Sequence, residues 1–545
     1  MASPTNLSIA QESELLPITE IADRAGLAPD EIDPYGRTKA KLTFSAIQRL
    51  QSADRGRLVL VTAITPTPAG EGKTTVTVGL AQGLRRIGLA AMPAVREPAL
   101  GPVFGIKGGA TGGGYSQVLP MEDINLFFTG DFPAISAAHN LLSAMVDSHL
   151  HHGNKLDMDP AWVTWPRTVD MNDRALRQIV IGLGAGAHGV ARESSFVITP
   201  ASEVMATLCL ANSLPNLQER LGRIMVGMNR GRTPIFAKDV EADGAMAMLL
   251  RDAWRPNLVQ TREGGPAFVH GGPFANIAHG CSSVVATQCA LGLCDWVVTE
   301  AGFASDLGAE KFMHLVRPEI GQSPDAVVLV VTVRAVRHHG DGDLAAGFAN
   351  VERHLHHLKQ YGVPVVVAVN KFKDDTDAEL DALRGLSQAA GVLAVVADPW
   401  NGGGAGCEAL AEVVAGLPRG GEVSRLYASD APIKEKLQTI VTKVYGGKGF
   451  RLTPHATRRL SWLEKQGLDT MPVCVAKTQA SLSDQGTLKN APTGFTVEFS
   501  DFRPSIGAGF VVAIAGDIML MPGLGKRPAA VDMSVDADGQ ISGLH

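Results

Sequence analysis

The stretch RLVLVTAITPTPAGEGKTT (57–75) decides the fold, because an apolar run leads straight into a glycine-rich turn that ends in Gly-Lys-Thr. A buried strand, a glycine-rich turn and a helix in this order are typical of a phosphate-binding loop. Gly70 and Gly72 allow backbone N–H groups to approach phosphate oxygens closely. The full pattern has glycine five positions before Gly72, where Thr67 stands, so the sequence predicts a variant of this loop.

The residues around the turn fit a site for the phosphates of ATP. Lys73 is placed to reach the β- and γ-phosphates, and Thr74 is the expected ligand of Mg²⁺. A simple strand–helix turn is the alternative, but the apolar run before it and the helical segment 74–88 after it argue against that interpretation. The predicted nucleotide site consists of Thr67, Pro68, Ala69, Gly70, Glu71, Gly72, Lys73, Thr74 and Thr75.

Six apolar runs predict the strands of a mostly parallel α/β sheet, because strands that are covered on both faces show no polar alternation. Two runs precede residue 100 and four follow residue 290, so we expect a large, mainly helical insertion into one sheet. Within it, helices are expected near 174–184, 201–213 and 244–254. The apolar runs are 58–64, 90–95, 296–302, 326–333, 363–372 and 391–397.

A chain of 545 residues is too long for one core, and this pattern divides it into three predicted domains. A P-loop-type nucleotide-binding domain takes residues 1–134 and 296–400, and the inserted domain takes 135–295. A C-terminal α/β domain takes 401–545, with a helix near 431–445 and strands near 507–521.

The composition is that of an ordinary globular protein, with 45% apolar and 19% charged residues. A net charge of −6 without a long basic run argues against a nucleic-acid partner. Six cysteines without a CxxC pair indicate reduced thiols. Glutamates interrupt the N-terminal segment and the apolar runs are strand-sized, so we expect a cytoplasmic protein without a secretion signal or a membrane partner.

Charged residues follow the second predicted strand and the next glycine-rich segment. Arg96 and Glu97 come at the carboxyl end of a strand, where parallel sheets bind ligands. An arginine there can hold a carboxylate or a phosphoryl group with two N–H donors. Asp131, in FTGD, is an acid that can reach Mg²⁺ or its waters. Each charge alone fits a surface or structural ion pair, but beside the loop they predict catalytic groups together with Lys73.

Twelve motifs point to a known family. The chain resembles formate–tetrahydrofolate ligase (10-formyltetrahydrofolate synthetase) from about residue 17 to its C-terminus, and HGGPFANIAHG and MPGL are long or unusual enough to make chance a poor explanation. In order, the motifs are TPAGEGKTT, REPALGP, FTGD, DMNDRALR, PNLVQT, HGGPFANIAHG, TEAGF, DLGAEKF, TVRA, AKTQ, SLSD and MPGL.

The resemblance implies a two-step reaction. ATP phosphorylates formate to formyl phosphate, and the formyl group then passes to nitrogen 10 of tetrahydrofolate, leaving ADP and phosphate. By this likeness Arg96 holds formyl phosphate, Glu97 is its neighbour, and Asp131 lies near the attacking amine. The family also implies Mg²⁺, stimulation by a monovalent cation such as K⁺ or NH₄⁺, and a homotetramer.

The folate partner needs a place for its flat pterin ring, for which an aromatic sandwich is the expected site. Phe372 comes just after one predicted strand and Trp400 after another, and without the resemblance such aromatics are more often packing at a sheet edge. The resemblance implies that these two rings flank the pterin. It also implies that Phe303 and Gly308 line the nucleotide site.

The chain departs from the family pattern at several positions. Phe128 and Pro133 stand where the family usually has histidine, and Ala480 replaces a usual tyrosine. The run after EKF lacks the common Lys-Cys-Arg, although Arg317 remains, and Lys373 stands where proline is frequent. Two missing histidines close to the FTGD aspartate are expected to affect proton handling or domain contacts.

Two alternatives to an active ligase stay open at this point. One is a divergent paralogue of low activity, and the other is a switch-type P-loop ATPase, which would carry another lysine where Pro68 stands. The histidines of HGGPFANIAHG lack a third spaced ligand, so a metal site there is not expected. The two HLHH clusters (149–152 and 354–357) are expected on solvated helix faces.

Overall fold

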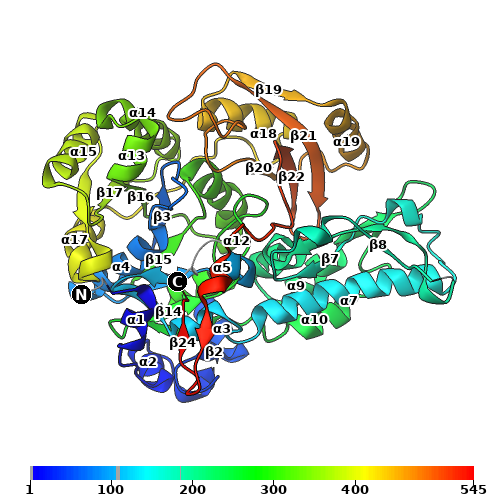
Figure 1. Ribbon diagram of the computed structural model, residues 1–545, viewed down its shortest axis with the longest axis horizontal. Coiled ribbons are helices and arrows are strands. Elements are labelled where there is room, and N and C mark those ends of the chain that lie inside the picture. The colour runs from blue at the N-terminus through cyan, green and yellow to red at the C-terminus, as the bar shows by residue number, and fades with distance from the viewer. Residues whose placement is uncertain (1–3, 106–110, 185, 545) are drawn as a thin grey trace.

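The six apolar runs form neighbouring strands of one large, mostly parallel sheet (Figure 1). The computed structural model describes residues 4–105, 111–184 and 186–544. Each predicted run is a strand of this sheet, and a seventh parallel strand, β14, joins them beside β4. In spatial order the parallel strands are β14 (Pro266–Val269), β4 (Ala91–Val95), β15 (Trp296–Glu300), β3 (Arg57–Ala63), β16 (Ala326–Val331), β17 (Val365–Asn370) and β18 (Ala394–Ala397).

The central strand β3 is apolar at successive positions because both faces of the sheet are covered. Val59 and Val61 pack in a cluster with the helix α4 (Lys73–Arg86), and α17 (Glu408–Gly416) packs against that helix. Leu58 and Leu60 belong to the cluster on the other face, with residues of α3 (Phe44–Gln51) and α11 (Val284–Leu293). This two-sided burial explains why the strand shows no polar alternation.

Short antiparallel strands extend the sheet beyond β14 and were not predicted. Strand β13 pairs antiparallel with β14 and with β2, so residues 257–269 belong to the main sheet although they fall within the expected insertion of 135–295. The domain boundaries therefore remain a proposal, with 257–295 better grouped with the sheet. The added strands are β1 (Ile32–Pro34), β2 (Ala40–Leu42), β5 (Gly112–Gly113), β6 (Ser116–Leu119) and β13 (Asn257–Thr261).

The region between the two parts of the sheet is rich in helices. Two of the three expected helices are confirmed, as α8 (Glu203–Leu210) and α10 (Asp243–Leu250). They accompany the long helix α7 (Asp131–His151) and α9 (Leu214–Gly222).

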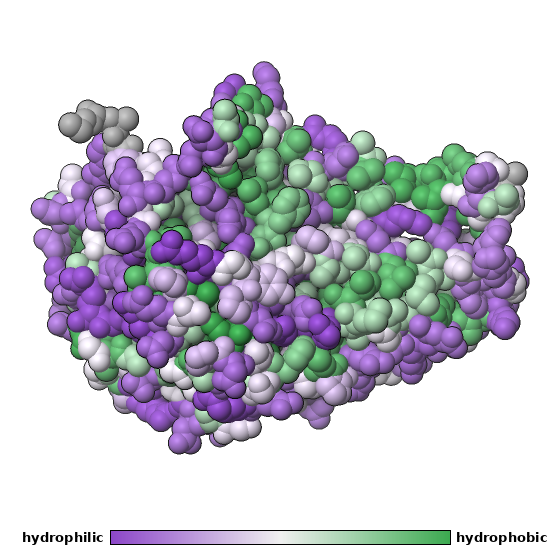
Figure 2. All heavy atoms as spheres, turned by 90° about the horizontal axis from the view of Figure 1, so that it is seen from below, coloured by the Kyte–Doolittle hydropathy of each residue, from purple (hydrophilic) through white to green (hydrophobic). Residues whose placement is uncertain are grey.

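The prediction of a helix near 174–184 is wrong. A short 3₁₀ turn precedes β8 (Ile179–Ile181), which pairs with β9 (Arg192–Ser194) in a hairpin. Gly182 takes a φ of 71°, a left-handed conformation that ends the strand and that glycine adopts without steric cost. At the end of the molecule formed by this hairpin and α7, Figure 2 shows apolar residues on the surface, and Val180 and Leu183 are 55% and 67% exposed.

The C-terminal region contains a second, mixed sheet with helices beside it. Its strands lie in the order β19 (Gly449–Leu452), β21 (Thr496–Ser505), β22 (Phe510–Ala515) and β20 (Val473–Ala476). Helix α18 (Ile433–Thr439) confirms the predicted helix, and α19 (Pro454–Lys465) packs on β21. Because α16 (Pro399–Gly402) and α17 pack on α4, the chain up to residue 416 stays with the main sheet rather than leaving it at 400.

All six cysteines are free and buried, as expected for thiols that serve as small apolar side chains. Among the described residues, the structure contains no helix that is both long and apolar enough to cross a membrane.

Candidate functional site

Most of the predicted site residues follow the carboxyl ends of five strands within one run of adjacent parallel strands, from β4 to β18. Strand β4 leads to Arg96, β15 to Phe303, and β3 to the loop 64–72. Strands β17 and β18 lead to Phe372 and Trp400. Ligands bind in such sheets at this edge. The pocket beside the loop is lined by Phe372 and Trp400 but not by Arg96 or Phe303.

The loop between β3 and α4 joins a buried strand to the N-terminus of a helix. Gly72 precedes the first residue of α4 and takes a φ of 73°, and a Cβ at this position would lie 2.5 Å from the Asn370 side chain. Lys73 and Thr74 are the first two residues of the helix, and the helix dipole places a partial positive charge at this end. This arrangement suits an anion above the loop.

Glu71 anchors the loop and does not face the crevice. Its carboxylate is 1% exposed and accepts hydrogen bonds from the Thr67 backbone N–H at 2.6 Å and from the Thr332 hydroxyl at 2.5 Å. The Asn370 amide donates to the Glu71 carbonyl at 3.0 Å. The carboxylate is thereby turned into the protein, where its charge does not oppose an anion at the helix N-terminus.

A pocket of about 250 Å³ opens beside the loop, and it brings the two predicted aromatic residues together. Gly114 lets the Trp400 ring come close, because a Cβ there would lie 2.7 Å from a ring carbon. The pocket is lined by Asn6, Ala69, Gly70, Gly72, Thr75, Gly112, Gly113, Arg334, Asn370, Lys371, Phe372 and Trp400.

Arg334 was missed by the residue-level analysis, although it lies within the motif TVRA. Its guanidinium lies over the Phe372 ring, 4.5 Å from the ring centroid, and donates to the Gly70 carbonyl. The arginine comes from α13 (Val333–His339), directly after β16. It therefore connects the loop to one of the two aromatic rings and adds a positive charge to the pocket wall.

Arg96 and Thr74 meet at a third group, Glu300, which the sequence analysis also missed. The Thr74 hydroxyl donates to Glu300 Oε2 at 2.8 Å, and the Arg96 guanidinium lies 3.6 Å from Oε1. Arg96 also donates to the Pro273 carbonyl at 3.3 Å. The sequence did contain a signal for Glu300, because it is a charged residue at the end of a fully buried strand. A buried carboxylate costs free energy unless it is paired or binds a ligand.

Glu97 and Asp131 lie close together in a buried polar cluster and do not line the pocket beside the loop. The Lys41 ammonium donates to Asp131 at 2.8 Å, with these side chains 1% and 3% exposed, and Asn257 donates to the other carboxylate oxygen at 2.7 Å. Burial and the charge of Asp131 raise the pKa of Glu97 well above its usual range. A protonated Glu97 can donate a hydrogen bond, whereas the charge of Asp131 is balanced by Lys41.

Phe303 and Gly308 lie on the segment after β15. Phe303 has a φ of 59°, which is rare for a residue with a side chain and marks a strained turn. A Cβ at Gly308 would lie 2.1 Å from the Gly302 carbonyl, so the segment packs closely against its own start. Residues Ser305–Ala309 form a single π-helical turn, a feature often found at functional sites.

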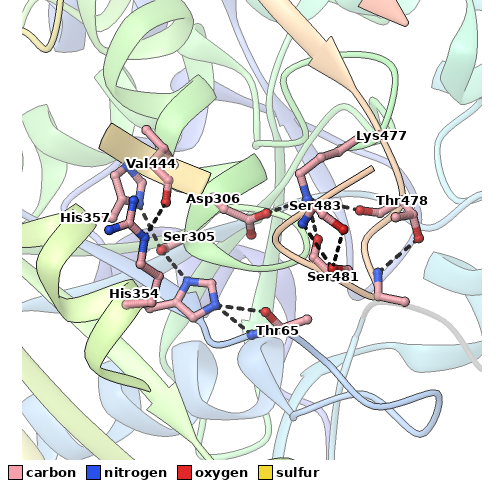
Figure 3. Close-up of polar contacts among 12 residues, drawn as sticks. Thr65, Ser305, Asp306, His354, His357, Val444, Lys477, Thr478, Ser481 and Ser483 are labelled. Carbon is pink, nitrogen blue, oxygen red and sulfur yellow. Dashed lines mark hydrogen bonds and ion pairs between the residues drawn. The ribbon is translucent and has the colours of Figure 1, made fainter. Parts of the chain in front are cut away.

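A buried hydrogen-bond network, centred on His354, connects the start of the loop after β3 with the turn after β15 (Figure 3). His354 Nε2 accepts from the Thr65 N–H at 3.0 Å, and its Nδ1 lies 2.7 Å from the Ser305 hydroxyl. His357 lies 3.0 Å from the same hydroxyl. Both imidazoles are buried, so the expectation that this HLHH cluster is solvated is wrong for His354 and His357 and holds for His356, which is exposed. Burial lowers the pKa of His354 well below its usual value.

The network continues into the C-terminal region. Asp306 forms a buried ion pair with Lys477 at 2.7 Å, and Lys477 donates to the Ser481 carbonyl at 2.5 Å (Figure 3). Asn490 donates its N–H to His339 Nδ1 at 3.0 Å, and His339 lies 2.9 Å from the Thr65 carbonyl. The segment that contains AKTQ and SLSD thus holds both the start of the loop and the turn after β15.

The departures from the expected pattern have structural contexts of their own. Phe128 is buried in an apolar cluster with Val78 and Val95 and has a φ of 43°. Pro133 and Ala480 are exposed.

Within the described residues, no group of His, Cys, Asp and Glu has the arrangement of a metal site. His270 uses both nitrogens, with Ser283 Oγ at 2.6 Å and the Ala253 carbonyl at 2.8 Å, and burial lowers its pKa to about 4.

Comparisons with known proteins agree on one family. A sequence model described as formate–tetrahydrofolate ligase matches residues 4–545. A protein of Paracoccus denitrificans (strain Pd 1222) with that name is 53% identical over 99% of this chain and all of its own length. Proteins with the same name from Symbiobacterium thermophilum and Methylococcus capsulatus (Bath) are 52% and 53% identical over 99% of this chain and all of their own lengths.

Proposed function

Since this chain belongs to the formate–tetrahydrofolate ligase family and is a ligase, we propose that it uses ATP to join formate to tetrahydrofolate by way of formyl phosphate. The observation that carries the proposal is the shared edge of the sheet. There, a phosphate-loop-like turn, an arginine and two aromatic rings follow neighbouring parallel strands. Each of these features matches one requirement of the reaction: nucleotide, acyl phosphate and pterin.

The nucleotide phosphates would bind at the N-terminus of α4. Backbone N–H groups around Gly70 and Gly72 would donate to phosphate oxygens, and Lys73 would add a positive charge. Thr74 and Glu300 offer hard oxygen ligands, and within the described structure Glu300 Oε1 has no hydrogen-bond partner, so the residues fit Mg²⁺. When bound there, Mg²⁺ would neutralise charge on the phosphate oxygens.

Formate must be activated before an amine can attack its carbon, because a carboxylate is a poor electrophile. A formate oxygen attacks the γ-phosphorus, the bond to the ADP oxygen breaks, and formyl phosphate and ADP result. Arg96 would hold the formate and phosphoryl oxygens with two N–H groups, and so would stabilise the charge that develops during transfer. Glu300 and the Pro273 carbonyl orient the guanidinium for this role.

The second step requires the amine of tetrahydrofolate close to the formyl carbon. Nitrogen 10 attacks that carbon, phosphate leaves with the bridging oxygen, and the amine loses its proton. Phe372 and Trp400 would hold the pterin ring, and Arg334 supports the Phe372 ring. Phe303 and Gly308 would line the nucleotide site.

Glu97 and Asp131 would act from inside the protein. In the resting enzyme Lys41 balances the charge of Asp131, so no uncompensated charge is buried. During the attack, the Asp131 carboxylate would stabilise the positive charge that develops on the amine. A monovalent cation, K⁺ or NH₄⁺, and a cytoplasmic homotetramer belong to the same proposal, on the likeness to the family alone.

The test is product formation by the purified chain from formate, Mg-ATP and tetrahydrofolate, with each component omitted in turn. The proposal expects 10-formyltetrahydrofolate and ADP in equal amounts in the complete mixture, and no 10-formyltetrahydrofolate when any one component is missing. ATP hydrolysis that ignores formate would favour the switch-type ATPase. Binding of ATP and folate without turnover would favour the low-activity paralogue.

A further inference from the structure

A second cavity, of about 380 Å³, lies between the helical region and the C-terminal sheet. One side comes from α7, α8 and β10 (Phe196–Ile198), and the other from α19, β21 and β22. In Figure 1 the ends of β21 and β22 lie next to the helical region. The cavity shares no lining residue with the pocket beside the loop, and its volume falls in the range of small-molecule sites.

One wall of this cavity is flat and apolar. The His139 ring stacks on Trp165 with centroids 4.2 Å apart and an angle of 25° between the planes. Both His139 nitrogens are engaged, by Ser202 Oγ at 2.7 Å and the Pro166 carbonyl at 3.0 Å, and burial lowers its pKa to about 3, so the ring is neutral. Flat apolar walls of this kind favour a flat ring as the occupant.

The opposite end is positively charged. Arg459 and Arg503 both lie near one acid, Asp501, with nitrogen–oxygen distances of 3.6 Å and 3.3 Å. His455 lies 3.1 Å from the same carboxylate. Two permanent positive charges therefore lie beside one negative charge, and the net positive charge that remains attracts an anion.

Two N–H donors at this end are buried without a hydrogen bond among the described residues, although the Arg459 donor is the nitrogen that lies 3.6 Å from Asp501. They are Nε of Arg459 and Nε1 of Trp462, and both residues line the cavity. A buried donor without an acceptor costs about 1–3 kcal/mol, so a ligand with acceptor oxygens gains by meeting them.

The remaining acid of the lining does not oppose an anion. Glu203 is buried and accepts from the Gly507 N–H at 2.8 Å. Burial raises the pKa of this carboxyl to about 8, so it is largely uncharged at neutral pH.

We propose that this cavity is a second ligand site, which takes a small aromatic monocarboxylate with its ring at Trp165 and its carboxylate at Arg459, Trp462 and Arg503. A ligand there contacts both the helical region and the C-terminal sheet. Because it binds the folded chain and not the unfolded one, it raises the melting temperature as its concentration rises.

Calorimetry on the full chain with indole-3-acetate tests the proposal, with the uncharged indole-3-acetamide as the matched ligand. The acid should bind with a Kd of about 1 mM or tighter, and the amide at least about tenfold more weakly. Arg459→Gln should weaken binding of the acid about tenfold and leave that of the amide unchanged. Arg458→Gln, the exposed neighbour on the same helix, should change neither.

Trp462→Phe provides a second variant that keeps an aromatic ring, a phenyl in place of the indole, and removes the N–H donor; it should weaken binding of the acid alone. Saturating ATP and tetrahydrofolate should leave binding of the acid unchanged. Equal affinities for acid and amide, equal effects of Arg459→Gln and Arg458→Gln, loss of binding on addition of ATP or folate, or no binding of the acid would each overturn the proposal.

Discussion

Replacement of Arg96 by alanine is the sharpest mutational test of the proposed site, because it separates formate activation from nucleotide binding. The guanidinium lies at the end of β4, between the Pro273 carbonyl and Glu300. Its Nε is buried and has no hydrogen-bond partner within the described residues. The side chain is thus held by few contacts and keeps N–H donors available to a ligand.

The expected loss follows from the charge that is removed. A preorganised charge at a phosphoryl-transfer site contributes roughly 3–4 kcal/mol to the transition state, so Arg96→Ala should lower formate-dependent turnover by several hundredfold. ATP should still bind, because its phosphates rest on the loop and on the N-terminus of α4. Arg96→Lys keeps the charge but not the two-pronged geometry, and it should recover only part of the activity.

Formyl phosphate can be trapped in the absence of tetrahydrofolate, while calorimetry follows nucleotide binding. Arg384→Ala serves as the control, since this arginine is 55% exposed and pairs with Asp381 on the same helix, α15 (Asp377–Ala389). It should leave both measurements unchanged. Formation of formyl phosphate by Arg96→Ala at the wild-type rate would refute the assignment, as would loss of ATP binding at intact stability.

Further predictions concern the aromatic pocket, the buried network, one departure from the family and the pH dependence. Trp400→Ala should raise KM for tetrahydrofolate roughly five- to tenfold, since a stacking face contributes about 1 kcal/mol, and leave KM for ATP nearly unchanged; steady-state kinetics with equal effects on both would contradict it. Lys477→Met should destabilise the fold by about 3–5 kcal/mol because it leaves the buried Asp306 charge uncompensated, and adding Asp306→Asn should restore much of the urea midpoint; no restoration would argue against the ion pair. Phe128→His should cost about 1–3 kcal/mol, because it places an imidazole in an apolar cluster, and undiminished stability with faster turnover would disprove this expectation. Glu310→Gln tests a carboxyl whose pKa burial raises to about 8. Wild-type stability falls as pH rises from the unfolded pKa to the folded one, so the variant should match the wild type near about pH 4 and exceed it by up to about 5 kcal/mol above about pH 8, whereas parallel pH profiles would show that this carboxyl does not ionise on unfolding.

The parallel core of the fold was predictable because its signal is local. A strand such as β3 is apolar at successive positions wherever both faces are covered, and this pattern stands in the sequence itself. The short strands β13 and β14 were not predictable in this way. Strand β13 (Asn257–Thr261) contains Asn, Gln and Thr, and it pairs with strands from distant parts of the sequence. The false helix near 174–184 came from spaced apolar residues that turned out to be a hairpin with glycines at its turn.

The candidate site was predictable where a residue follows a strand, and it was not where a residue is held by the tertiary structure. Arg96 was proposed because parallel strands bring their carboxyl ends together, whereas Phe372 and Trp400 were proposed on the resemblance to the family. His354 was taken for a surface residue because a histidine-rich run is polar, yet Thr65, 289 residues away, satisfies its nitrogen inside the protein. Burial of a polar side chain depends on partners that a single sequence does not identify.

The central claim is that formate is activated by transfer of a phosphoryl group to one of its oxygens. Turnover with ¹⁸O-labelled formate tests it directly, because the bridging oxygen of formyl phosphate comes from formate and leaves with the phosphate. Mass spectrometry of the phosphate released by this chain, in the presence of Mg-ATP and tetrahydrofolate, should find one ¹⁸O atom in each molecule, and the formyl group should keep the other. Phosphate without label, formed along with 10-formyltetrahydrofolate, would contradict the formyl phosphate intermediate and with it the role proposed for Arg96.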